Sequence, residues 1–156
     1  MMLNVEDEVK KFHNDCKLLA KSIIKKEGSL NMTVLALHQK DSNSFTTVVI
    51  PAIGFLYDPE DKSLFLNAVK HAITLIKPVA IAFVSEAWMI KRDVNDGIDI
   101  DKRVSEYDDK QEIVMVQIET YKDTSLTIYE MIRNGKSIKL KLNEEQTQVG
   151  KDKVGG

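Results

Sequence analysis

The sequence lacks most of the features that would assign it a chemistry. Its only cysteine is Cys16, so neither an internal disulfide bond nor a cysteine-based zinc cluster can form within one chain. No Walker loop, dinucleotide-binding glycine pattern, nucleophile elbow or His-Glu-x-x-His zinc motif is present. We therefore predict no cofactor and no metal.

The chain also has little excess charge and no long hydrophobic run. It carries 22 Lys and Arg against 24 Asp and Glu, which disfavours nucleic acid or an anionic membrane as a partner. The acidic N-terminus has no apolar core of a signal peptide, and the run from Pro78 to Ile90 is too short to cross a bilayer. These observations predict a cytoplasmic protein without membrane association.

What the chain does have is the composition of a globular domain. Of its 156 residues, 43% are apolar and 29% are charged. A chain of this length buries about 70% of its unfolded surface, so it needs no metal or disulfide to hold its core. We expect a single domain over residues 1–142 and a flexible C-terminal tail over residues 143–156.

Two helices are expected from spacing and end signals. In the first, apolar residues recur at steps of four and three, Asn4 can cap the start, and Gly28 follows the lysine-rich last turn. The second begins at Asp58, with Pro59 at its first position, and Pro78 ends it. Its apolar stripe contains Phe65, Val69, Ala72 and Ile76, widened by Leu64, Ala68 and Ile73.

The strands fall in two groups. Strands at Met32–His38 and Phe45–Ile50 form a hairpin, and the apolar run Val79–Val84 predicts a buried strand parallel to the second of these. Three more strands follow a charged loop at 91–110, and Asn134-Gly135 marks the last hairpin turn because both residues tolerate positive φ. The predicted class is α+β: a mixed sheet of five or six strands, two helices packed on one face, and the order α-β-β-α-β-loop-β-β-β.

The most informative segment is Ser85-Glu86-Ala87-Trp88-Met89, which leaves the buried strand and leads to the charged loop. Strand ends that feed long loops collect functional groups in α/β proteins. We therefore name Ser85, Glu86 and Trp88 as candidate site residues, together with Arg103 and Glu112, which flank the start of the next strand. The alternative is structural: Glu86 pairs with Arg92 or Arg103, and Trp88 covers one end of the core.

The same segment resembles a set of uncharacterised proteins of bacteria and phages. In these proteins a hydrophobic strand ends in Ser-Glu-Ala-Trp-Met and a charged loop follows. The next strand opens with a basic or polar residue and a glutamate, here Lys110-Gln111-Glu112. The resemblance implies that Glu86, Trp88 and Glu112 are positions of interest, and it implies no activity.

Three weaker patterns do not carry a function. The aspartates of 93–101 have the wrong register for an EF-hand, because glycine falls at the fifth loop position and Val104 at the twelfth. The three histidines lack metal-ligand spacing. Glu119 and Lys122 are one residue too far apart for the nuclease pattern.

Three functions remain open from the sequence. The favoured one is a non-catalytic binding or assembly module that self-associates through an edge strand. The second is a metal-dependent hydrolase with an acidic site at Glu86 and Glu112. The third is a binder of a small ligand or peptide that uses Trp88 and the 91–110 loop.

Overall fold

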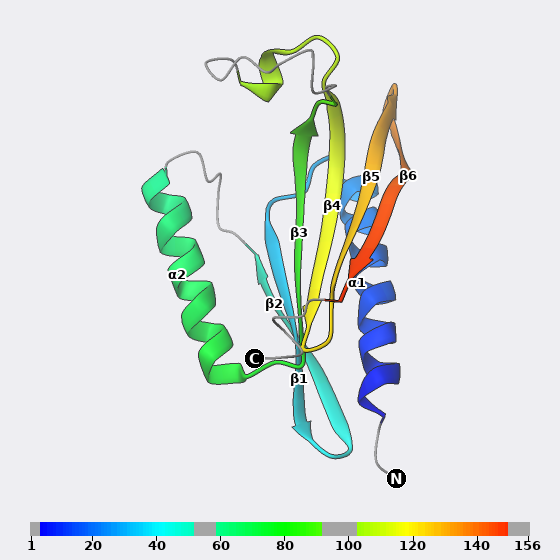
Figure 1. Cartoon of the computed structure of the whole chain (residues 1–156). Helices are drawn as coiled ribbons and strands as arrows, with labels where there is room; N and C mark the ends of the chain where they lie inside the picture. Colours follow the sequence, from blue (N-terminus) through cyan, green and yellow to red (C-terminus); the bar gives the residue numbers. More distant parts are fainter. Residues whose placement is uncertain (1–3, 52–58, 92–102, 150–156) are drawn as a thin grey trace.

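The protein is an α+β domain, described here by a computed structural model that covers residues 4–51, 59–91 and 103–149. Its elements follow the predicted order, with one short 3₁₀ helix added before the last three strands (Figure 1). They are α1 (Val5–Glu27), β1 (Thr33–Asp41), β2 (Ser44–Pro51), α2 (Pro59–Ile76), β3 (Ala80–Met89), η1 (Val104–Glu106), β4 (Gln111–Thr120), β5 (Thr124–Asn134) and β6 (Ser137–Gln148).

The six strands form one sheet in the order β2-β1-β3-β4-β5-β6. Strands β2 and β3 point the same way, as predicted for a crossover through α2, but β1 lies between them. Among the described residues every hydrogen-bonded pair of strands is antiparallel, so the sheet is antiparallel where a mixed one was expected. Central β1 is buried on both faces along its first five residues, which explains its continuous apolar sequence.

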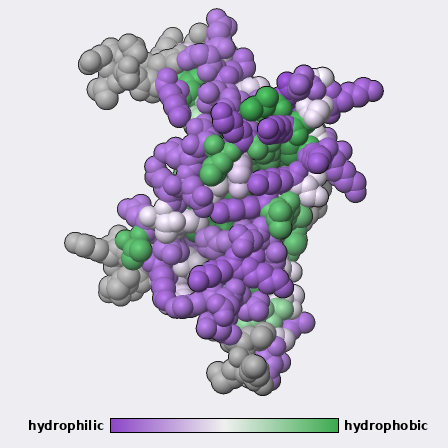
Figure 2. Space-filling model, turned by 90° about the vertical axis from the view of Figure 1, so that its right-hand side faces the viewer, coloured by the Kyte–Doolittle hydropathy of each residue, from purple (hydrophilic) through white to green (hydrophobic). Residues whose placement is uncertain are grey.

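Helix α1 has the ends that its sequence predicts. The side chain of Asn4 accepts a hydrogen bond from the backbone nitrogen of Glu6 at 2.9 Å, and Gly28 caps the other end at φ 76°. Its buried residues are Phe12, Cys16, Ala20 and Ile24. Figure 2 shows that the face of the molecule on this side is mainly hydrophilic, with hydrophobic side chains gathered in its upper half.

The two helices lie on opposite faces of the sheet, which corrects the expectation of one shared face (Figure 1). The core around α1 contains Leu35 and Leu37 of β1, whereas Val34 and Ala36 are fully buried outside that cluster. Alternate residues of a strand point to opposite faces, so Val34 and Ala36 belong to the face on which α2 contacts β1.

Within the described residues, neither helix is long and apolar enough to span a membrane.

The last hairpin differs in detail from its prediction. Asn134 pairs with Ser137 and ends β5, so the two turn residues are Gly135 and Lys136. Only Gly135 has positive φ, at 65°, as glycine does at the first central position of a type II′ turn. A β-carbon at Gly135 would meet no atom within 4 Å, so lack of space does not require glycine here. The turn needs glycine because of its positive φ.

Gly135→Ala is expected to lower the free energy of unfolding by about 1–2 kcal/mol, because a β-carbon is strained in the left-handed region. Urea denaturation measures this loss. The matched substitution Lys136→Ala should leave the midpoint unchanged, since Lys136 is exposed and its φ is not positive. Equal effects of the two substitutions would contradict the assignment.

Strand β6 continues six residues beyond the predicted end of the domain, so residues 143–148 belong to the sheet. Val149 follows the strand, and residues 150–156 of the predicted tail lie outside the described residues. Leu142 pairs with Tyr129 and Glu144 pairs with Ile128, which leaves Asn143 as a bulge. The bulge and three lysines protect this edge against further pairing, as expected for an edge strand; the lysines of the hairpin and strand are Lys136, Lys139 and Lys141.

Candidate functional site

The site predicted at the end of a strand lies inside one. Strand β3 runs to Met89, past the predicted end at Val84, because β4 supplies a hydrogen-bonding partner for each of its residues. Glu86 is opposite Val114, and Trp88 is opposite Glu112. Since opposite residues share a face, Glu86, Trp88 and Glu112 all lie on the face that carries α1.

These three residues line one cavity of about 360 Å³ beyond the C-terminal end of α1. Alternation along β3 places Ser85 on the opposite face, so the structure does not bring it into the cavity. Arg103 precedes η1, where its backbone nitrogen donates to the carboxylate of Glu106 at 3.1 Å, and it does not line the cavity either. The lining residues are Ser29, Glu86, Ala87, Trp88, Glu112, Met131 and Arg133; we call this space the Trp88 cleft.

Arg133 is the charged residue of the Trp88 cleft that the sequence did not indicate. Its Nε and Nη2 atoms donate to the two carboxylate oxygens of Glu112 at 2.6 and 3.2 Å. Nη2 also donates to the carbonyl oxygen of Gly28 at 3.1 Å, which ties β5 to the end of α1. The hydrogen bond to Glu112 raises the pKa of Arg133, and the negative charges of Glu112 and Glu86 add to this effect.

An arginine pair of the kind considered for Glu86 is formed by Glu112. Glu112 is held by a two-bond pair with arginine, the geometry that gives such pairs most of their strength. Within residues 4–51, 59–91 and 103–149, no ion pair or hydrogen bond engages the exposed carboxylate of Glu86. Its expected partner Arg92 lies outside the described residues, as do the aspartates of 93–101.

Trp88 is 44% exposed, so it does not act mainly as a cover for the core. The ammonium group of Lys110 lies 5.4 Å from the centre of its ring, at the distance of a cation–π contact. An exposed indole is unusual enough to suggest a binding function, because Trp is largely buried on average in folded proteins.

No family model, no curated protein and no solved structure matches this chain. The resemblance carried by Val79–Met89 therefore stays a prediction.

A metal site is not assembled in the part of the chain that the structure describes. No group of three or more His, Cys, Asp or Glu residues there is placed to hold a metal ion. The hydrolase hypothesis requires Glu86 and Glu112 to share a cation, but both oxygens of Glu112 accept hydrogen bonds from Arg133. The geometry consequently gives no support to that alternative.

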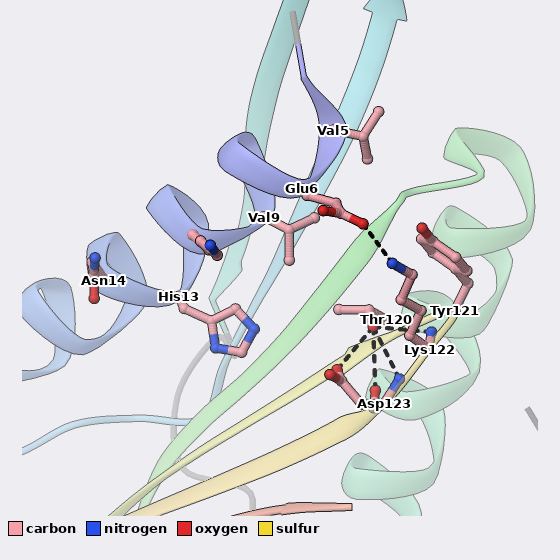
Figure 3. Close-up of a pocket in the computed structure, with 10 residues that line it drawn as sticks. Val5, Glu6, Val9, His13, Asn14, Thr120, Tyr121, Lys122 and Asp123 are labelled. Atoms are coloured by element: carbon pink, nitrogen blue, oxygen red, sulfur yellow. Dashed lines mark hydrogen bonds and ion pairs between the residues drawn. The ribbon is translucent and has the colours of Figure 1, made fainter. Parts of the chain in front are cut away.

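A second cavity, of about 510 Å³, lies between the first turns of α1 and the turn that joins β4 to β5 (Figure 3). Glu6 accepts a hydrogen bond from Lys122 at 2.6 Å across its mouth, which lowers the pKa of Glu6 and raises that of Lys122. Thr120 donates to Asp123 at 2.9 Å, and burial lowers the pKa of His13 on the facing wall. Because its two carboxylates are satisfied internally, we assign no ligand to this cavity.

Proposed function

We propose that the protein is a non-catalytic binding module that recognises a cationic side chain, of lysine or arginine, in the Trp88 cleft. The observation that carries this proposal is the carboxylate of Glu86, which no ion pair or hydrogen bond engages in the described part of the chain, two residues from an exposed tryptophan on the same face of β3. A volume of about 360 Å³ is at the small end of ligand pockets, which span about 300–1,000 Å³.

The charge of the cleft supports a cation over an anion. Arg133 is neutralised by Glu112, so the remaining charge among the lining residues is that of Glu86, and the ammonium of Lys110 lies outside the lining, over the indole. An incoming guanidinium or ammonium would gain a charge-assisted hydrogen bond from this carboxylate. It would also gain a cation–π contact with the indole, a contact that Lys110 already makes within the chain.

Fluorescence titration tests the proposal, because Trp88 is the only tryptophan and reports this cleft alone. The probes are N-acetyl-arginine amide and N-acetyl-glutamate amide. A single side chain is expected to bind with a Kd in the millimolar range, near −4 kcal/mol. We expect the arginine probe to change the emission of Trp88 saturably and the glutamate probe to leave it unchanged.

Glu86→Gln is expected to weaken arginine binding about tenfold, since a hydrogen bond to a charged group contributes about 1.5–3 kcal/mol and the site is partly open to solvent. Glu144→Gln is the matched control, because Glu144 is exposed and lies on the opposite face of the same sheet. Equal binding by wild type and Glu86→Gln, or equal responses to both probes, would contradict the proposal.

A further inference from the structure

The two edges of the sheet differ in how they are protected. Edge strand β2 has no charged residue among its eight, and five consecutive positions from Thr46 to Ile50 are β-branched. The other edge, β6, carries lysines and a bulge. An uncharged edge with exposed main-chain groups is a template for another strand, and natural proteins cover or charge such edges unless they use them.

Helix α2 leaves hydrophobic side chains exposed above the same edge. Leu64 and Leu75 are 67% and 72% exposed, although the sequence predicted that Leu64 and Ala68 would widen the stripe facing the sheet. Leu64, Ala68, His71 and Leu75 are spaced by four, three and four residues, so these exposed residues form one outward stripe. The helix contacts β1, the strand next to β2.

The directions of these elements suit a two-fold axis. Strands β2 and β3 point the same way, so α2, which connects them, runs in the opposite direction. An axis perpendicular to the sheet beside β2 would pair β2 antiparallel with its copy and bring the two α2 helices side by side, also antiparallel. Leu64 of each helix would then lie near Leu75 of the other, with the small Ala68 near the centre.

We propose that two copies of the chain associate through β2 and the outward stripe of α2. A bound peptide strand would cover the edge of β2 but leave the leucines exposed, whereas a second copy covers both at once. This interface is separate from the Trp88 cleft, which lies on the opposite face.

The test is analytical ultracentrifugation of the full chain over a dilution series. We expect a reversible dimer for wild type and at least a tenfold higher dissociation constant for Thr47→Lys. Thr47 is exposed in the middle of β2, and two lysines would meet near the axis. The matched control is Thr147→Lys, the same substitution at an exposed position of the protected edge, which should leave the dissociation constant unchanged.

Leu75→Gln provides an independent test of the helix contribution, because an exposed side chain can be replaced without disturbing the fold. We expect this variant to weaken the dimer at least fivefold with an unchanged melting temperature, and it decides the matter if Thr47→Lys does not fold. A monomeric wild type at all concentrations overturns the proposal. A dimer that resists both substitutions, or that Thr147→Lys breaks instead, shows that the interface is elsewhere and overturns it equally.

Discussion

Phe12→Ala is expected to reduce the free energy of unfolding by about 3–5 kcal/mol, the cost of removing a large side chain from a packed core. Phe12 is 2% exposed and is the bulkiest of the fully buried side chains. It lies where α1 packs on the sheet. Because α1 is the helix that covers this face, no other helix is at hand to fill the cavity that the substitution leaves. Since a domain is stable by about 5–15 kcal/mol, the variant would be marginal or unfolded at 37 °C.

Urea denaturation followed by circular dichroism measures this loss. The control is Leu18→Ala on the same helix, because Leu18 is 63% exposed and its replacement should change stability by less than about 0.5 kcal/mol. If Phe12→Ala and Leu18→Ala cost the same, α1 does not pack on the sheet through the face described here.

The second large effect concerns the thiol of Cys16. This residue is completely buried on α1, and burial raises its pKa from 9.0 to about 12. The thiolate is the reactive form, so at pH 8 the native protein should hold about a thousandfold less of it than an exposed cysteine would. We expect Cys16 to be nearly inert to Ellman's reagent in the native state and to react fully in urea.

The control for this experiment is Ser22→Cys, which adds a thiol at an exposed position of the same helix. One of its two thiols should react rapidly in the native state while the other stays protected. Rapid reaction of the wild-type protein at a rate independent of urea would contradict the burial of Cys16.

The same pKa shift predicts a dependence of stability on pH. Between pH 9 and about 12 the unfolded chain loses the thiol proton and the native state keeps it, so the unfolded state binds fewer protons and stability falls as pH rises. Each pKa unit corresponds to 1.36 kcal/mol, which gives a loss of up to about 4 kcal/mol over this window. Cys16→Ala should show a shallower decline, and the difference between the two proteins isolates the thiol from other alkaline titrations.

The sequence predicted best the elements whose ends and spacing depend on residues close together in the chain. The capping residues of α1 and its apolar spacing agree with the structure, because each depends on residues within a few positions of one another. The ends of β3 and β6 were wrong for the opposite reason. Each strand continues as long as its neighbour offers hydrogen-bonding partners, and nothing in the strand's own residues reveals the length of that neighbour.

The candidate site was predicted in part. Position at a strand end indicated Glu86 and Trp88, and the resemblance implied Glu112. The pairing of β3 with β4 brings all three to one face. Arg133 was missed because its contact with Glu112 joins residues 21 positions apart and depends on the register between β4 and β5. Ser85 was included because the sequence predicted that the buried strand ends just before it, whereas strand alternation turns it away from the cleft.

The bulge at Asn143 has a consequence for the solution behaviour of the protein. A sheet whose two edge strands can both pair with other molecules polymerises, since each added molecule presents a further unpaired edge strand. The bulge and the lysines of β6 prevent strand pairing at that edge. Pairing through β2 alone would therefore end at a dimer. Deletion of Asn143 would straighten β6 and leave only its lysines to oppose the pairing of two β6 edges.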